Sequence, residues 1–262
     1  MRLLVTGASG TVGRSLASAL EAEGGTLIAW DRSEVPIDDY AAMDAFVIAV
    51  APDALVHLAV ASQPGHEQLG PEQSWLANYE WTSELAWITR QRQIPFVFTS
   101  TVMVFSDDTP GPYTIASPPT AEHGYGMQKR RAEARVFEQN PNARVVRLGW
   151  QIGHELHGNH MGAWLEARRD EDIPAAIRWM PACSFVDDSA VELLACLRRP
   201  PGLYMLDANE GWSFYDIARA LRARHRTGWR LKPSYAWAYD QRMLDPRCPM
   251  PTLAERLPEL KA

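Results

Sequence analysis

The chain has 262 residues, of which 46% are hydrophobic and 22% are charged, and its formal net charge is −6 at pH 7. This size and balance fit one α/β domain with a modest appendage. The acidic charge argues against a nucleic-acid-binding protein, which needs a basic face, and the apolar stretches are too short to span a membrane.

Three glycines connect the first apolar strand to an amphipathic helix. They follow this strand with the spacing G-x-x-G-x-x-G, and Leu16 and Leu20 continue the apolar face of the helix. Such a turn lets backbone N–H groups approach a pyrophosphate, which then lies at the positive N-terminus of the helix. The pattern therefore predicts a dinucleotide site. The residues expected to form it are Gly7, Ser9, Gly10, Thr11, Val12 and Gly13.

An acidic residue follows the second expected strand. A glycine pair ends the first helix, residues 26–30 form the strand, and Asp31 comes directly after it. A carboxylate at this position accepts a hydrogen bond from the 2′-hydroxyl of an adenosine ribose and repels a 2′-phosphate, so Asp31 slightly favours NAD. Arg32 and Arg14 leave NADP open, because either guanidinium can reach a 2′-phosphate.

Apolar strands and helices alternate through the first half of the chain. This alternation is typical of an α/β fold with a doubly wound parallel sheet, a Rossmann fold. The further strands are expected over residues 53–59, 94–100 and 144–148, and the helices over residues 74–92 and 125–139. The intervening segment 107–122 is rich in proline, glycine and polar residues, and we expect a surface loop there.

The second half of the chain is less regular. Asp188 and Ser213 are each expected to cap a helix, because an apolar periodic segment follows each of them. The tail over residues 231–262 contains several prolines and has little periodicity. Its secondary structure is not predicted.

The chain is expected to divide into two parts. Residues 1–153 form the Rossmann domain, and residues 180–198 return to it. Residues 154–179 and 199–262 form a small C-terminal cap. Ligands of doubly wound sheets lie beyond the carboxyl ends of the strands, so we expect the cap to bind the substrate there.

Tyr125 and Lys129 lie four residues apart near the start of an expected helix and therefore share one helical face. A phenol titrates at about 10, and a neighbouring cation stabilises the phenolate and lowers this pKa. We expect the pair to transfer a proton, with Lys129 also holding the nicotinamide ribose. Ser100 and Thr101 end the preceding strand, where a hydroxyl can donate a hydrogen bond to a substrate carbonyl.

These motifs resemble those of the extended short-chain dehydrogenases/reductases, and within them the dTDP-4-dehydrorhamnose reductases. Residues 6–13 match TGxxGxxG, residues 100–105 match STxxVF, and residues 147–153 match RxxWxxG. The resemblance implies an NAD(P)-dependent oxidoreductase that acts on a keto or hydroxyl group of a sugar-like, nucleotide-linked substrate. The two long helices are candidates for a homodimer interface. The catalytic residues that the resemblance implies are Thr101, Tyr125 and Lys129. The further cofactor-binding residues that it implies are Leu58, Ala59, Asn78 and Thr99.

The chain departs from these reductases at Val102 and Met103, where they usually carry an Asp-Tyr pair. Together with Trp150, these two residues are the expected substrate contacts. Neither Val102 nor Met103 can do acid–base chemistry, which argues against a dehydratase. Two alternatives stay open: an epimerase that keeps its NAD bound, and a non-catalytic regulatory protein that binds NAD(P).

Two other groups of residues carry side chains that can bind metals. His154, His157 and His160 are spaced so that they drift off one helical face, and we expect no metal there; contact with substrate is the alternative. The cysteines form neither a metal motif nor a disulfide framework, which is typical of a reducing cytoplasm. They are Cys183, Cys196 and Cys248. The chain begins directly with its first strand, so we expect no signal peptide and a cytoplasmic location.

Overall fold

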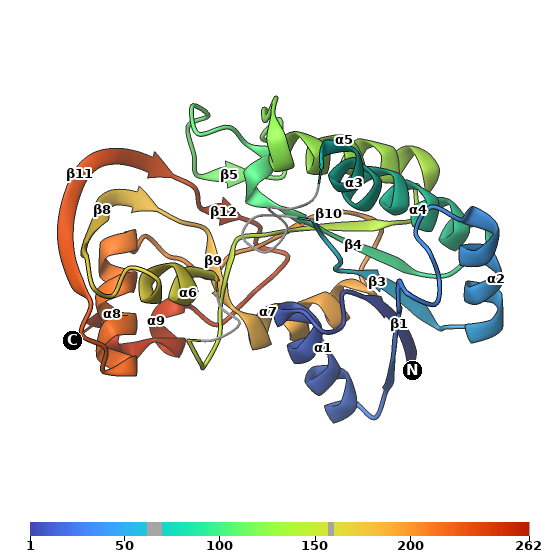
Figure 1. Ribbon diagram of the computed structural model, residues 1–262, viewed down its shortest axis with the longest axis horizontal. Coiled ribbons are helices and arrows are strands. Elements are labelled where there is room, and N and C mark those ends of the chain that lie inside the picture. The colour runs from blue at the N-terminus through green and yellow to red at the C-terminus, as the bar shows by residue number, and fades with distance from the viewer. Residues whose placement is uncertain (62–69, 157–159, 262) are drawn as a thin grey trace.

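The computed structural model describes residues 1–61, 70–156 and 160–261 and has helices on both faces of a central sheet, with a smaller lobe beside it (Figure 1). The strands are β1 (Arg2–Thr6), β2 (Thr26–Ala29), β3 (Ala54–His57), β4 (Phe96–Thr101), β5 (Tyr113–Thr114), β6 (Arg144–Leu148), β7 (Trp150–Ile152), β8 (Asp172–Met180), β9 (Cys183–Phe185), β10 (Gly202–Leu206), β11 (Arg230–Asp240) and β12 (Met243–Leu244). The α-helices are α1 (Thr11–Ala22), α2 (Tyr40–Val50), α3 (Pro71–Trp75), α4 (Trp81–Gln91), α5 (Gly124–Gln139), α6 (His160–Glu166), α7 (Val186–Cys196), α8 (Phe214–His225) and α9 (Leu253–Arg256). Other helical segments are the π-helical η1 (Leu76–Glu80) and the 3-10 helices η2 (Val102–Val104) and η3 (Pro258–Lys261).

The central sheet has the strand order β10-β6-β4-β3-β1-β2, and every neighbouring pair is parallel. β2 lies on one side of β1 and β3 on the other, so the strand order reverses between β1 and β3. Ligands of such sheets bind at this switch point, beyond the carboxyl ends of the strands. Thr6 and His57 pair across it at the ends of their strands. The predicted α/β Rossmann fold is confirmed.

The inner strands β1, β3, β4 and β6 bury both of their faces under helices. Leu3 and Val5 pack in one cluster with Leu16 and Leu20 of α1 and with side chains of α7. Leu4, between them, packs on the opposite face with side chains of α2, α4 and α5. Successive side chains of a strand point to opposite faces, so one apolar run serves both layers. In Figure 1, α1 and α7 lie below the sheet, and α4 and α5 lie above it.

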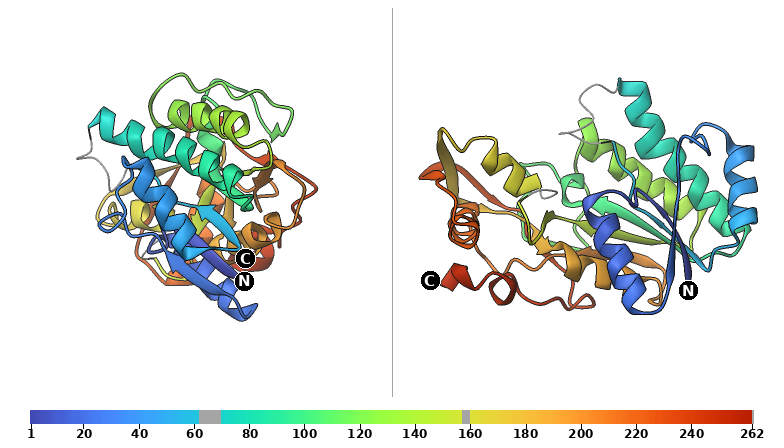
Figure 2. Two further views of the ribbon diagram at one scale, coloured as in Figure 1. Left: turned by 90° about the vertical axis from the view of Figure 1, so that its right-hand side faces the viewer. Right: turned by 60° about the horizontal axis from the view of Figure 1, so that its bottom comes forward.

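The smaller lobe has a core of its own. β8 and β11 form a parallel two-stranded sheet, and α8 packs against it. Buried side chains of these strands form one cluster with side chains of α6, α8 and α9. Both Figure 1 and the right-hand view of Figure 2 place this lobe at one end of the central sheet rather than over a face of it.

One element of residues 199–262, which are expected to form the cap, belongs to the central sheet instead. Residues 202–206 form β10, which pairs with β6 at the edge of the central sheet. Its side chains alternate between buried layers like those of the other strands, and a short apolar run of this kind gives no local sign of its partner. Of residues 180–198, α7 packs against α1, whereas β9 pairs with β7.

The long helix expected over residues 74–92 begins at Pro71 and continues to Gln91, with the π-helical η1 between two α-helical parts. Ser213 caps α8 as predicted. Its hydroxyl accepts a hydrogen bond from the Asp216 N–H, and the Asp216 carboxylate accepts one from the Ser213 N–H, which forms a capping box.

Asp188 does not cap α7. The helix begins earlier, at Val186, and Asp188 lies inside its first turn. The carboxylate instead accepts two hydrogen bonds from Arg256 of α9, which anchors the tail against α7. The partner lies 68 residues away, so no local pattern indicates it.

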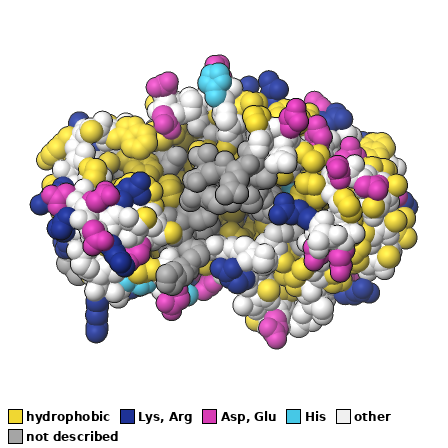
Figure 3. Space-filling model, in the orientation of Figure 1, with side chains coloured by type: hydrophobic (Ala, Val, Ile, Leu, Met, Phe, Trp, Pro, Cys, Tyr) yellow, Lys and Arg dark blue, Asp and Glu magenta, His cyan; other side chains and the backbone are white. Residues whose placement is uncertain are grey.

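The surface carries both signs of charge. On the face shown in Figure 3, basic and acidic side chains are interspersed over both lobes rather than gathered into one basic area. This distribution agrees with the negative net charge of the chain. Among the described helices, none combines the length and the apolar composition that crossing a membrane requires.

Candidate active site

The glycine turn lies at the switch point between β1 and β3. Gly7 has a φ of 70°, and a Cβ atom at this position would lie 2.8 Å from the Ala59 nitrogen, so the two strand ends approach too closely for a side chain. The Gly10 N–H donates to the Gly7 carbonyl at 3.0 Å, and α1 begins with the next residue. Ser9 and Gly10 are exposed, and Gly10 has no side chain to cover the helix N-terminus. This arrangement fits an anionic group, as the sequence predicts.

Asp31 lies just beyond β2, with Arg32 beside it, and both side chains are exposed. The Asp31 carboxylate accepts hydrogen bonds from the Ser33 hydroxyl at 2.7 Å and from the Ser33 N–H at 2.8 Å. These bonds lower the pKa of Asp31 from its ordinary value, so the group is an oriented carboxylate at neutral pH. Arg14 donates to the Ser9 carbonyl, which places its guanidinium beside the glycine turn.

A chain of buried hydrogen bonds starts at the end of β1. The Thr6 hydroxyl accepts from two backbone N–H groups that follow β3, and it therefore donates its own proton to Nδ1 of His57, 2.7 Å away. Nε2 of His57 then carries the ring proton and donates to the Thr82 hydroxyl at 3.0 Å. Burial, together with the nearby Lys129 cation, holds the pKa of His57 well below its ordinary value, so the ring is neutral.

Asn78 continues this chain from η1 to α5. Its backbone carbonyl accepts from the Thr82 hydroxyl at 3.1 Å. Its side-chain amide exchanges two hydrogen bonds of 2.8 Å with the backbone of Ala61 and donates to Oε1 of Gln128 at 2.7 Å. Both amide protons are thus used within the protein, and the cofactor contact expected of Asn78 stays a prediction. The residue fixes α5 against the segment that follows β3.

Tyr125 and Lys129 lie on α5, which packs against β4. Lys129 is 2% exposed, and its ammonium lies 4.0 Å from the ring centroid of Phe98 on β4. Burial lowers the pKa of Lys129 to about 7, and the nearby Glu133 opposes this shift. Burial also raises the pKa of the Tyr125 phenol. The lowering expected from Lys129 is not found, because desolvation is what shifts this pKa.

Gly126 brings the start of α5 against η2. A Cβ atom at this position would lie 2.0 Å from the Met103 carbonyl oxygen, so only a glycine allows the contact. Thr101, at the end of β4, accepts a hydrogen bond from the Met103 N–H at 3.2 Å through Oγ1. The same hydroxyl carries a proton that it can donate to a ligand. The helix with Tyr125 and Lys129 and the strand end with Thr101 are therefore held together.

The side chains expected to contact ligands differ in exposure. Met103 is 51% exposed, whereas the Val102 side chain is 3% exposed and packs in a hydrophobic cluster, so of the two only Met103 offers its side chain to a ligand. The Thr99 hydroxyl donates to the His57 carbonyl at 3.0 Å and is likewise used within the protein. Trp150 is half-buried at the start of β7.

A buried ion pair joins α5 to β6. Arg147 donates from Nε to Oε1 of Glu133 at 2.9 Å and from Nη2 to Oε2 at 2.7 Å, and the two side chains are 3% and 7% exposed. The guanidinium also lies 4.9 Å from the ring centroid of Phe105. Sequence reasoning missed Glu133. The four-residue spacing from Tyr125 to Lys129 to Glu133 is the signal that indicates it, because all three lie on one helical face.

His154 pairs with Asp187, with 2.9 Å between Nε2 and Oδ2. The other oxygen of this carboxylate accepts from the Ser15 hydroxyl of α1 at 2.8 Å. His154 therefore connects the segment after β7 to α1 and α7. His157 lies outside the described residues, and His160 is the first residue of α6.

Comparison with known proteins assigns the chain to a family. The family described as RmlD substrate binding domain matches residues 1–247. The chain belongs to this family. The dTDP-4-keto-6-deoxy-D-glucose reductase of Streptomyces niveus is 28% identical over 221 residues, which cover 83% of this chain and 76% of the relative.

Two solved structures share the fold of this RmlD-family chain. A dTDP-4-dehydrorhamnose reductase from Bacillus anthracis, in complex with NADP, superimposes with a TM-score of 0.83 at 19% identity and covers 98% of this chain and 96% of its own. UDP-glucose 4-epimerase from Thermotoga maritima, with UDP-glucose, gives a TM-score of 0.80 at 17% identity and covers 100% and 96%. At these identities the likeness concerns the fold alone.

Glu133→Gln tests the ion pair of this RmlD-family protein. The substitution leaves Arg147 as a buried charge without its counter-ion, so the free energy of unfolding should fall by about 3–5 kcal/mol. Urea unfolding followed by circular dichroism measures the change. Glu138→Gln, which removes an exposed partner of Arg135 on the same helix, should cost less than about 1 kcal/mol. Equal losses in the two variants would contradict a special role of the buried pair.

Lys129→Met tests the lowered pKa of Lys129. Between its folded pKa of about 7 and its ordinary value of 10.5, the unfolded chain binds a proton at Lys129 that the folded chain does not. Stability therefore rises with pH in this window, and the wild type should gain about 1 kcal/mol per pH unit relative to the variant. Urea unfolding of both proteins across the window measures this difference. Parallel pH profiles would show that Lys129 titrates alike in the folded and unfolded chains.

Proposed function

We propose that the protein is an NAD(P)-dependent reductase that acts on a keto group of a nucleotide-linked deoxy sugar. Membership of the RmlD substrate binding domain family supports this proposal. So do a relative named dTDP-4-keto-6-deoxy-D-glucose reductase and a structural neighbour with bound NADP. The names of these relatives favour a dTDP-linked 4-keto sugar as the substrate class.

The residues at the switch point fit a nicotinamide dinucleotide. When bound, this cofactor supplies the hydride that reduces a carbonyl carbon. The exposed turn from Gly7 to Gly10 and the N-terminus of α1 bind its pyrophosphate through backbone N–H groups. The Asp31 carboxylate, held by Ser33, accepts a hydrogen bond from a ribose hydroxyl.

Two side chains act on the oxygen of the reduced carbonyl, and a third acts on the phenol. The Tyr125 hydroxyl gives it a proton, and the Thr101 hydroxyl donates a hydrogen bond that orients it and stabilises its developing negative charge. The Lys129 ammonium, held over the Phe98 ring, stabilises the phenolate that Tyr125 becomes.

Membership of the RmlD substrate binding domain family and the reductase relative carry the direction of the reaction, and the raised pKa of Tyr125 agrees with it. A phenol with a raised pKa keeps its proton at neutral pH. Reduction of a carbonyl needs such an acid, whereas oxidation of an alcohol needs the phenolate as a base. The half-buried, protonated phenol therefore serves a reductase as its proton donor.

Tyr125→Phe removes the proton donor and leaves the glycine turn intact. Turnover of a dTDP-4-keto-6-deoxy sugar, followed as oxidation of NADPH or NADH, should fall by about a thousandfold. Dissociation constants of both cofactors, measured by fluorescence titration, should change by less than about twofold. Tyr235→Phe, at a tyrosine that is 67% exposed, is the matched control and should leave turnover unchanged. Unchanged turnover in Tyr125→Phe would refute the proposed acid.

The same assay separates the reductase from the two alternatives. A reductase oxidises one equivalent of reduced cofactor for each keto sugar consumed. An epimerase converts its sugar with no net change in nicotinamide absorbance and retains its cofactor through purification. A regulatory protein binds the cofactor and turns over no keto sugar.

We further propose that Asp31 favours NADH over NADPH, because an ionised carboxylate repels a 2′-phosphate. Asp31→Asn keeps an oxygen that can accept from Ser33 but removes the negative charge. The ratio of kcat/KM for NADPH to that for NADH should then rise by about tenfold. Asp38→Asn removes an exposed charge further along the same loop and should leave the ratio unchanged. If this ratio is equal in the wild type and in Asp31→Asn, Asp31 does not determine the preference between the two cofactors, and Arg32 or Arg14 does.

A further inference from the structure

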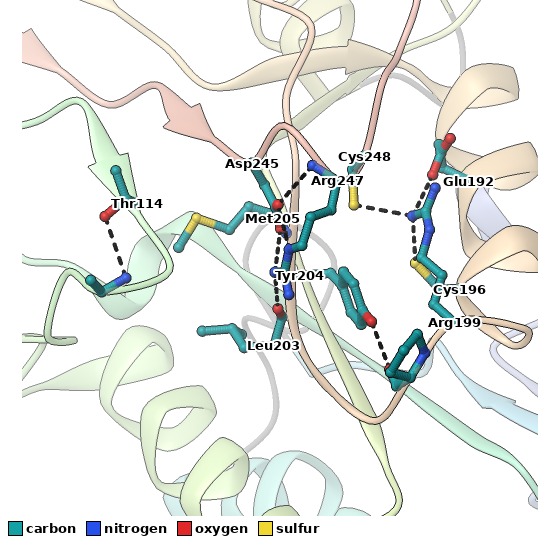
Figure 4. Close-up of polar contacts among 12 residues, drawn as sticks. Thr114, Glu192, Cys196, Arg199, Leu203, Tyr204, Met205, Asp245, Arg247 and Cys248 are labelled. Carbon is teal, nitrogen blue, oxygen red and sulfur yellow. Dashed lines mark hydrogen bonds and ion pairs between the residues drawn. The ribbon is translucent and has the colours of Figure 1, made fainter.

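Two of the three cysteines, which lie far apart in the sequence, are neighbours in the fold. Cys196 ends α7, and Cys248 lies in the tail that follows β12. Their sulfurs and a carboxylate oxygen of Glu192 all lie within 4.8 Å of one another. Cys196 is fully buried and Cys248 is 6% exposed. Figure 4 shows the two thiols on either side of one guanidinium.

That guanidinium belongs to Arg199. Its Nη1 donates to the sulfur of Cys248 at 3.1 Å and to the sulfur of Cys196 at 3.4 Å, and the same nitrogen makes an ion pair of 2.7 Å with Glu192. A cation within reach of both sulfurs stabilises negative charge on either of them.

The two thiols differ in their readiness to ionise. A hydrogen bond from Cys248 and the charge of Arg199 lower the pKa of Cys196, and together they outweigh burial, which raises it. The pKa of Cys248, which gives that hydrogen bond, is raised. The pair therefore places one thiol that ionises more readily beside one thiol that keeps its proton, which is the arrangement needed for attack followed by disulfide closure.

A metal ion is a poorer occupant of this cluster. Among the described residues the cluster offers three ligand atoms, whereas structural zinc sites use four. Arg199 contacts all three of these groups, so a divalent cation would have to displace a guanidinium that already pairs with Glu192.

We propose that Cys196 and Cys248 form a redox-sensitive thiol pair that a small peroxide converts to a disulfide. The Cys196 thiolate attacks one oxygen of hydrogen peroxide; an S–O bond forms, the O–O bond breaks, and the leaving hydroxide takes a proton and becomes water. The Cys248 sulfur then attacks the Cys196 sulfenic acid; the S–S bond forms, the S–O bond breaks, and the thiol proton leaves with the second water. The two thiols lose two electrons, and the peroxide gains them.

The disulfide would fasten the tail to the Rossmann domain. Just before Cys248, Asp245 accepts from the Met205 N–H at 3.2 Å, and Arg247 donates to the Leu203 carbonyl. These contacts place the tail along the outer edge of β10, so a bond from Cys248 to α7 holds the tail in place over this edge. The proposal does not depend on the proposed reductase activity, because neither thiol belongs to the site around Tyr125.

Treatment of the reduced full-length protein with an equimolar amount of hydrogen peroxide tests the proposal. Alkylation of the remaining thiols followed by non-reducing peptide mapping should show a peptide that joins Cys196 to Cys248, with the loss of two hydrogens. Cys183 is the internal control, since its pKa is raised where that of Cys196 is lowered, and it should be recovered alkylated. The melting temperature should rise by roughly 5 °C on oxidation and return on reduction.

Two variants test the role of Arg199. Arg199→Gln should slow formation of the disulfide by about tenfold. Arg198→Gln, at the adjacent exposed residue that pairs with Glu23, is the matched control and should leave the rate unchanged. Cys248→Ser should leave a sulfenic acid on Cys196 that dimedone traps. Oxidation of Cys183 at the same rate, a wild-type protein that stays fully reduced, or bound zinc on purification with unreactive thiols would each overturn the proposal.

Discussion

One buried cation constrains much of the site. The Lys129 ammonium lies on a helix that packs against the central sheet, almost without solvent. A charge in such a place needs compensation, which the Phe98 ring and the Glu133 carboxylate provide. Glu133 in turn binds Arg147 on the next strand, and the neutral state of His57 avoids a second cation beside Lys129. The same desolvation keeps the Tyr125 phenol protonated.

The sequence predicts the features that depend on neighbouring residues. The turn around Gly7 and the pair Tyr125 and Lys129 arise from spacing within a few residues, and the structure places them at the carboxyl end of the sheet. The cap at Ser213 is local too and is confirmed. These features are predictable because the local geometry of a turn or a helix is enough to bring their residues together.

The features that sequence reasoning missed join residues that are distant along the chain. The position of Val102 next to Thr101 indicates a substrate contact, but in the fold its side chain points into a hydrophobic cluster. The Asn78 amide bonds to Ala61 and Gln128, and no local pattern shows where its partners lie. The contacts of the tail cannot be predicted for the same reason, since the neighbours of Cys248, which are Cys196 and Glu192, are distant in the sequence.

The late position of β10 in the chain has a consequence for biosynthesis. β6 is buried in the finished sheet, yet its neighbour on one side consists of residues 202–206. While the ribosome makes the intervening residues, Val145 and Val146 lie on a strand whose free edge has no partner within the sheet. An open apolar edge promotes pairing with other nascent chains. The order of synthesis therefore leaves this edge of β6 open until β10 has been made, and the tail that borders β10 comes later still.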